Sequence, residues 1–87
     1  MCKTSDLQST YLQYPASGIN GHNLKEYTLY DTVENCQELC DSIPQCQNLE
    51  RRRSDSLCLF QAVTAQDYPA DWDTASPAWD FYQKNCA

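Results

Sequence analysis

The cysteines carry the clearest chemical signature in this sequence. A zinc site needs closely spaced Cys-x-x-Cys pairs or clusters of cysteine and histidine, but the chain has no Cys-x-x-Cys and its one histidine is His22. An even number of cysteines in so short a chain instead predicts a disulfide framework formed in an oxidising compartment. We therefore expect a secreted or extracellular protein without a metal or other cofactor. The six cysteines among the 87 residues are Cys2, Cys36, Cys40, Cys46, Cys58 and Cys86.

The other polar residues give little support for catalysis. A hydrolytic triad needs a nucleophile and an acid around a histidine, and no nucleophile motif lies near His22. Asp71 and Asp73 offer a carboxylate pair of the glycosidase kind, but two acids in one loop are commonplace. Asp67 and Asp80 extend this acidic run, which lacks the ligand order of an EF-hand calcium site. The sequence therefore predicts a protein that is not an enzyme and holds no calcium.

The charge of the chain restricts its partners. A net charge of −6 argues against nucleic acid, because binding a phosphate backbone needs clustered Lys and Arg. The one basic cluster is Arg51-Arg52-Arg53, which we interpret as a strand end whose charges pair locally with neighbours such as Asp55. The alternative is a minor contact of Arg51 and Arg53 with an anion such as a sulfated glycan. No apolar run approaches the roughly 18 residues of a membrane span. None resembles a signal peptide either, so we expect that the leader was removed or that the domain was excised and given a new initiator Met.

One helix is predicted from Asp31 to Ile43. Asp31 suits the N-cap position, and Glu34 three residues later completes a capping-box pattern. Pro44 ends the helix because proline lacks a backbone donor and restricts the residue before it. Apolar residues at spacings of three and four predict a buried stripe made of Val33, Cys36, Leu39, Cys40 and Ile43.

Strands are predicted on both sides of this helix. Glu26 to Tyr30 alternates two faces, and Gln47–Arg52 with Leu57–Val63 forms a hairpin around a polar turn. Residues 79–82 alternate aromatic and polar side chains as a half-buried strand does. The expected fold is therefore α+β, with an antiparallel sheet and one helix. Because a chain of this length has room for one core, residues 1–87 are predicted to be a single domain.

Helix geometry narrows the disulfide pairing. Cys36 and Cys40 lie one turn apart on the same face, so a bridge between them is awkward and each is expected to tie the helix to another element. Cys46, just past the turn at Pro44, is placed to reach Cys40, and Cys58 in an apolar strand is placed to face Cys36. The two terminal cysteines would then pair with each other. Six cysteines allow 15 connectivities, so other pairings stay open.

Several motifs recur in a fixed order along the chain: Cys2, Gly21-His22-Asn23-Leu24, Cys36-Gln37-Glu38-Leu39-Cys40, Pro44-x-Cys46, Cys58-Leu59 and Trp79-x-Phe81-Tyr82-x-Lys84-x-Cys86. Together these motifs resemble PAN/apple domains over nearly the whole chain. The resemblance implies a sheet of about five antiparallel strands wrapped around one helix. It also implies three bridges, Cys2–Cys86, Cys36–Cys58 and Cys40–Cys46, and an extracellular module that binds a protein or a glycan in adhesion or host contact. The acidic, glycine-poor composition is similar to versions in secreted fungal proteins.

Trp72 is the first candidate for contact with such a ligand. It lies in a predicted surface loop, Tyr68 to Pro77, where Asp71 and Asp73 on either side make full burial difficult. An exposed indole ring stacks on a sugar face, and carboxylates accept hydrogen bonds from hydroxyl groups. The alternative is that Trp72 folds inward as a lid on a small core. A second functional hypothesis is a stand-alone secreted effector or inhibitor of one target protein.

Overall fold

This computed structural model describes residues 10–85, which form short strands, one α-helix and one short 3-10 helix. In chain order, the elements are β1 (Thr10–Pro15), β2 (Gly18–Ile19), β3 (Asn23–Tyr30), α1 (Val33–Ser42), β4 (Asn48–Arg52), β5 (Leu57–Gln61), the short 3-10 helix η1 (Pro69–Asp71), β6 (Trp72–Asp73) and β7 (Trp79–Asn85).

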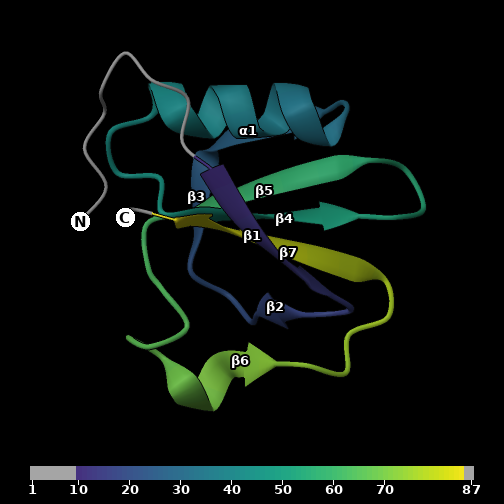
Figure 1. The fold of residues 1–87 in the computed structure, drawn as a ribbon, viewed down its shortest axis with the longest axis vertical. Helices are drawn as coiled ribbons and strands as arrows, with labels where there is room; N and C mark the ends of the chain where they lie inside the picture. The colour runs from purple at the N-terminus through teal and green to yellow at the C-terminus, as the bar shows by residue number, and fades with distance from the viewer. Residues whose placement is uncertain (1–9, 86–87) are drawn as a thin grey trace.

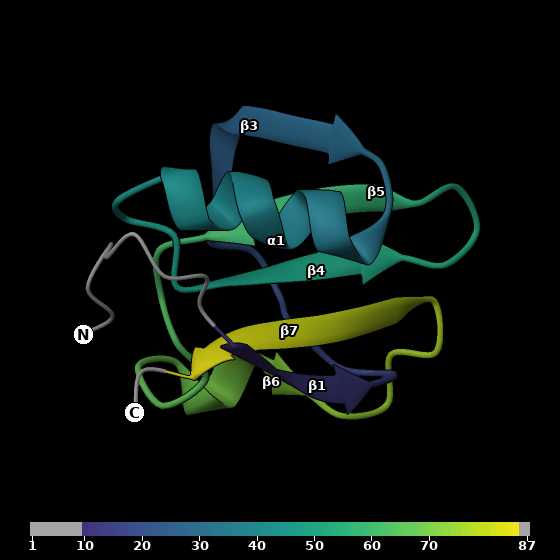
Figure 2. The ribbon, with the colours of Figure 1, turned by 45° about the horizontal axis from the view of Figure 1, so that its top comes forward.

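Five strands form one antiparallel sheet in the order β1-β7-β4-β5-β3. The predicted β4–β5 hairpin is confirmed, and its turn includes Ser56 with a left-handed φ of 65°. The C-terminal strand β7 lies between β1 and β4, so both ends of the described chain belong to the sheet (Figures 1 and 2). Strand β1 was not predicted, because polar and apolar residues do not alternate clearly along it. It forms a strand by pairing with β7.

Helix α1 covers one face of this sheet and forms the main core with it (Figure 2). The predicted apolar stripe is confirmed, because its cysteines and Ile43 are buried and its other members are partly buried against the core. The chain turns away after the helix, as Pro44 predicts. The buried residues of this core are Cys36, Cys40, Ile43, Cys46, Leu49, Cys58, Phe60 and Tyr82.

The start of α1 corrects the predicted cap. The N-cap is Thr32, whose Oγ1 accepts a hydrogen bond from the Asn35 amide at 3.2 Å. Asp31 supports this cap from outside the helix, because its Oδ1 accepts from the Thr32 amide at 2.7 Å and from the Asn35 side chain at 2.9 Å. The predicted start at Asp31 and the capping box with Glu34 are therefore wrong, since shifting the cap by one residue places Asn35 at the capping-box position.

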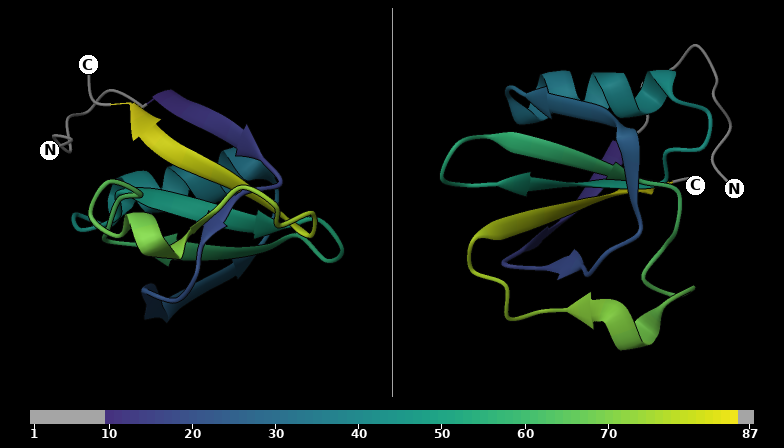
Figure 3. Two further views of the ribbon diagram at one scale, coloured as in Figure 1. Left: turned by 90° about the horizontal axis from the view of Figure 1, so that it is seen from below. Right: turned by 180° about the vertical axis from the view of Figure 1, so that it is seen from behind.

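A second, two-stranded sheet of β2 and β6 lies on the face of the main sheet away from α1 (Figures 1 and 3). This layer corrects one prediction, because β6 lies within the expected surface loop of residues 68–77, where it pairs with β2. It also explains why β7 does not alternate between buried and exposed residues. Tyr82 faces the helix core, whereas Phe81 contacts Trp72 of the second layer, and both are buried.

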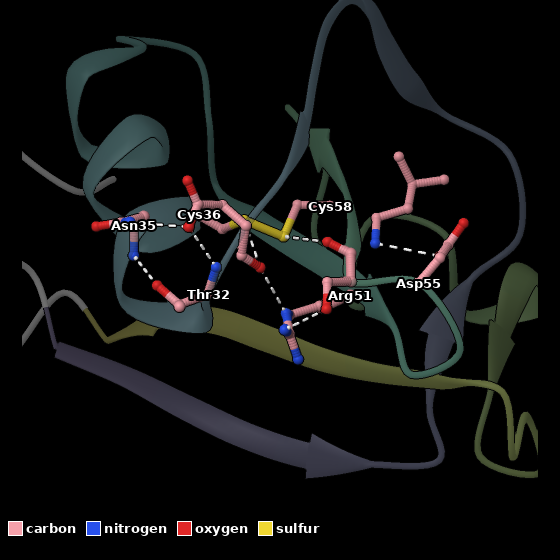
Figure 4. Close-up of a disulfide and its surroundings, with 9 residues drawn as sticks. Thr32, Asn35, Cys36, Arg51, Asp55 and Cys58 are labelled. Atoms are coloured by element: carbon pink, nitrogen blue, oxygen red, sulfur yellow. Dashed lines mark hydrogen bonds between the residues drawn. A yellow bond between two sulfur atoms is a disulfide. The ribbon is translucent and has the colours of Figure 1, made fainter.

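Two disulfides fix α1 to its surroundings. Cys36 bonds Cys58 on β5, and Cys40 bonds Cys46 beyond the helix, as the helix geometry predicted. Figure 4 shows the first of these bridges beside Arg51 and the Thr32–Asn35 cap. The predicted Cys2–Cys86 bridge lies outside the described residues.

Candidate functional site

The turn before β3 and the short helix η1 bring together three polar or aromatic residues that lie far apart in the sequence. His22 has a left-handed φ of 63° and follows Gly21, whose φ is 77°. This backbone places the imidazole ring over Tyr68, with ring centroids 4.0 Å apart, and Nε2 of His22 lies 2.8 Å from Oδ2 of Asp71. Tyr68 and Asp71, both sequence candidates, therefore share one exposed cluster that histidine organises.

Trp72 begins β6 directly after this cluster. Its ring meets Phe81 edge-on at 4.9 Å between centroids and Tyr14 of β1 at 5.7 Å. The residue is half-buried, so it covers the small core between the layers while part of its surface stays accessible. Tyr14 is 38% exposed beside it. The two interpretations of Trp72 as a ligand contact and as a lid are thus compatible in one geometry.

The aspartates of the acidic run turn to separate partners. Oδ1 of Asp73 accepts from the Ala75 amide at 2.8 Å, and Oδ2 of Asp67 accepts from the Thr64 amide at 3.0 Å. Asp80 on β7 binds an arginine, described below, and Asp71 binds His22. Within residues 10–85, no group of three or more His, Cys, Asp or Glu side chains is arranged to hold a metal ion.

The arginine candidates lie elsewhere and have partners within the chain. Arg51 is partly buried on the helix side, where it donates to the Asp31 carbonyl at 3.0 Å and to Oγ of Ser56 at 2.7 Å. Arg53 makes two hydrogen bonds to Asp80, at 3.0 and 2.6 Å, and these lower the pKa of the Asp80 carboxyl. Arg52, between them, binds Asp55, so this basic cluster does pair locally.

Beneath β2 lies a buried acid, Glu50 of β4. Its Oε2 accepts a hydrogen bond from the Ile19 amide at 2.5 Å and from Nε2 of Gln61 at 3.3 Å. Burial raises the pKa of the Glu50 carboxyl to about 7, and the two hydrogen bonds offset only part of that shift. Glu50 thus attaches the second layer, which carries Trp72, to the main sheet.

A second buried charge, Lys84 of β7, supports the other end of the helix. Its Nζ donates to the Cys40 carbonyl at 3.1 Å and lies 3.9 Å from Oδ1 of Asp41. The hydroxyl of Tyr11 donates to the same Asp41 oxygen at 2.7 Å. Burial lowers the pKa of Lys84 and raises that of Tyr11. A cation at the C-terminal carbonyls complements the helix dipole, so this cluster has a structural explanation.

Sequence reasoning overlooked three residues of these clusters: His22, Tyr14 and Glu50. His22 was considered only as a zinc ligand or a catalytic base, and its partner Asp71 lies 49 residues away. Glu50 was not predicted to be buried. Its burial depends on β2 crossing over it, and no local pattern encodes a contact 31 residues apart.

The His22 side chain is hydrogen-bonded to a carboxylate, Asp71. In residues 10–85 no hydroxyl or thiol is hydrogen-bonded to His22, so the His22–Asp71 pair lacks the nucleophile of a triad. No helix in this part of the chain is long and apolar enough to span a membrane.

Comparison with known proteins agrees with the fold and the cysteine arrangement. No curated protein and no solved structure matches the chain at a significant level. The family model described as the PAN domain matches residues 2–86, and that family consists of protein- or carbohydrate-binding modules that are generally non-catalytic and typically extracellular. Because this match covers essentially the whole chain and the sheet, helix and two disulfides agree with it, the chain belongs to the PAN domain family.

Proposed function

We propose that this PAN domain is an extracellular, non-catalytic recognition module that binds a neutral carbohydrate through its η1 face. We define the η1 face as Tyr14, His22, Tyr68, Asp71 and Trp72. The observation that carries the proposal is the hydrogen bond between His22 and the Asp71 carboxylate, formed where His22 stacks on Tyr68 and directly before Trp72 in the chain. Aromatic rings provide stacking surfaces for sugars, and an oriented carboxylate accepts hydroxyl hydrogen bonds.

The charges around this face favour a neutral glycan over a sulfated one. Asp67 and Asp73 flank the face in sequence, and the chain carries a net charge of −6. Bringing an anionic group to this surface costs electrostatic energy, whereas the hydroxyl groups of a neutral sugar meet acceptors. The arginines that would suit an anion, Arg51 and Arg53, are occupied by partners within the chain.

A protein ligand is the second candidate, and one observation favours it. Leu12 and Tyr14 lie on the same side of β1 and are 45% and 38% exposed. Strand β1 is at the edge of the described main sheet. An exposed apolar pair on an edge strand is a usual contact for a protein partner. In either case we propose a role in adhesion or surface contact.

Binding to an array of neutral and sulfated glycans tests the proposal. We expect binding to one class of neutral glycan, with Trp72→Ala and Tyr68→Ala each weakening the measured Kd about tenfold or more. Tyr30→Ala is a matched control, because Tyr30 is 61% exposed on β3 at the opposite edge of the sheet. Trp72→Phe separates lost stacking area from disturbed packing against Phe81.

Two results would overturn this assignment. Binding only to sulfated glycans that Arg53→Ala abolishes would move the site to the arginines. Binding to a protein partner that Leu12→Ala weakens and Tyr68→Ala leaves intact would favour the edge strand β1 over the η1 face.

A further inference from the structure

A buried polar cluster lies between the two sheets, where an apolar contact would be expected. We define the Glu50 cluster as Gly18, Ile19, Asn48, Glu50 and Gln61. Glu50 is 7% exposed, and Asn48 and Gln61 are fully buried. Asn48 and Gln61 are register partners on β4 and β5, and Glu50 lies two residues along β4 on the same face. All three side chains therefore face β2.

The backbone of β2 fits closely over the Glu50 carboxyl. An ideal Cβ built on Gly18 would lie 2.8 Å from Oε2 of Glu50, so any larger residue would force the Glu50 carboxyl to shift. The next residue, Ile19, donates its amide to the same oxygen at 2.5 Å. Because Gly18 has no side chain and the Ile19 amide points at Oε2, the backbone of β2 fits closely around the Glu50 carboxyl.

Hydrogen-bond donors are scarce in the cluster. The Gln61 amide nitrogen has two hydrogens but lies within reach of four oxygens: those of Ile19, Gly21, Asn23 and Glu50, at 3.0, 2.9, 3.1 and 3.3 Å. Asn48 donates to the Val63 carbonyl. Within residues 10–85, Oδ1 of Asn48 and Oε1 of Gln61 have no hydrogen-bond partner. The cluster therefore has more hydrogen-bond acceptors than donors. An ionised Glu50 carboxylate would add only further acceptors, whereas a protonated one adds the donor that the cluster lacks.

We propose that Glu50 reversibly binds a proton in this cluster, and that loss of the proton loosens the β2–β6 layer from the main sheet. The protonated acid supplies a donor to the buried acceptors and carries no charge. The ionised acid leaves a charge under β2 that two hydrogen bonds compensate only in part, because burying a charge without a cation is costly. Hydration of that charge requires β2 to lift.

Charged groups on the surrounding elements do not neutralise Glu50. On β4, Arg52 binds Asp55 and lies over the Trp79 ring. On β6, Asp73 binds the Ala75 amide, and on β7, Asp80 binds an arginine. His22 beyond β2 binds Asp71. None of the ion pairs among the described residues includes Glu50. The remaining neighbours on the same face are uncharged: Asn23, Leu59, Gln61 and Phe81.

The cluster is connected to the η1 face by two short steps. Ile19, whose amide binds Glu50, is the register partner of Trp72. The next amide, of Asn20, donates to the Asp71 carbonyl at 2.9 Å. Loosening β2 therefore disturbs both residues. In the part of this inference that rests on the proposed function, ligand binding weakens as pH rises through neutrality.

Titration of the ligand-free protein by NMR tests whether proton loss from Glu50 loosens the β2–β6 layer. We expect the carboxyl carbon of Glu50 to titrate near pH 7, with the Ile19 amide and the Trp72 indole signals shifting at the same midpoint. The hydrogen-exchange protection factor of the Ile19 amide should fall about tenfold or more between pH 5 and pH 8. A Glu50 titration near 4.5, or a protection factor that does not change with pH, would overturn the proposal.

Variants separate the proton from other effects of pH. Glu50→Gln keeps an acceptor for Ile19 and adds permanent donors, so its Ile19 protection should stay constant from pH 5 to pH 8. Glu26→Gln, an exposed glutamate on β3, is the matched control and should keep the wild-type profile. If Glu50→Gln does not fold, the NMR titration of the wild-type protein still tests the proposal.

The ligand-binding arm distinguishes this inference from the proposed function. If a glycan ligand is found, its Kd should weaken about fivefold between pH 5.5 and pH 8 in the wild type, and should not change in Glu50→Gln. An absence of glycan binding would refute the proposed function and leave the NMR result standing. Normal binding that does not depend on pH, with the NMR titration near 7, would refute the coupling alone.

Discussion

At the scale of single residues, the two glycines have different reasons to be glycine. Gly18 lies where β2 passes over the Glu50 carboxyl, and a side chain there would collide with Oε2. Gly21 has open space around it but adopts a φ of 77°, which residues with a side chain rarely do. One position is therefore restricted by packing and the other by backbone conformation.

This difference predicts unequal costs for two alanine variants. Gly18→Ala should lower the free energy of unfolding by about 1–3 kcal/mol, because Glu50 must shift and weaken its bond to Ile19. Gly21→Ala should cost about 1 kcal/mol, from the left-handed backbone alone. Urea denaturation followed by tryptophan fluorescence measures both values. A Gly18→Ala cost no larger than that of Gly21→Ala would contradict the close contact.

At the scale of elements, the start of α1 depends on one hydroxyl. Thr32→Ala should lower the free energy of unfolding by about 1 kcal/mol, because the Asn35 amide loses its acceptor. Glu34→Ala is the control and should change it by less than about 0.5 kcal/mol, since this exposed residue is not the capping-box partner. Equal losses in the two variants, measured by chemical denaturation, would restore the capping box predicted from the sequence.

The two disulfides of α1 should contribute unequally to the free energy of unfolding. By the entropy of the unfolded loop, the Cys36–Cys58 bridge stabilises by about 3.4 kcal/mol and the Cys40–Cys46 bridge by about 2.4 kcal/mol. Their sequence separations are 22 and 6 residues, and all four cysteines are buried. Replacing each pair by alanines and comparing denaturation midpoints should therefore show the larger loss for the longer loop. The reverse order would mean that packing around the short bridge outweighs loop entropy.

At the scale of the whole molecule, opposing groups shape the dependence of stability on pH. The pKa values of Asp31, Asp55 and Asp80 are lowered by hydrogen bonds from Asn35, Arg52 and Arg53, respectively. Their contribution is present above the ordinary value of 3.8 and is lost as pH falls below it. Glu50 acts in the opposite sense, because its folded pKa of about 7 exceeds its ordinary value of 4.5. Its contribution is full below 4.5 and is lost as pH rises towards 7.

The domain should therefore be most stable near pH 4–5. Between pH 4.5 and pH 8, the free energy of unfolding should fall by up to about 3 kcal/mol, which is the pKa difference of Glu50 expressed as energy. Denaturation at a series of pH values measures this fall, and Glu50→Gln should remove most of it. Stability that rises across the same range would contradict the assignment.

Local patterns determined much of the architecture. The spacing of apolar residues and Pro44 located the helix to within two residues at its start and one at its end. The same helix period placed Cys36 and Cys40 on one face, which led to both observed bridges. The alternation in residues 26–30 and the polar turn after Arg52 located β3 and the β4–β5 hairpin. These features were predictable because neighbours along the chain dictate them.

Only the tertiary structure decided how the layers meet. Strand β1 becomes a strand by pairing with β7, and the two-residue strands β2 and β6 exist only through each other. The pairing of His22 with Asp71 and the burial of Glu50 under Ile19 join residues 49 and 31 positions apart. The sequence by itself therefore determined a disulfide-stapled helix on a sheet and pointed to Tyr68, Asp71 and Trp72. Which groups orient those residues, and which buried acid lies behind them, follow from long-range contacts that no local pattern contains.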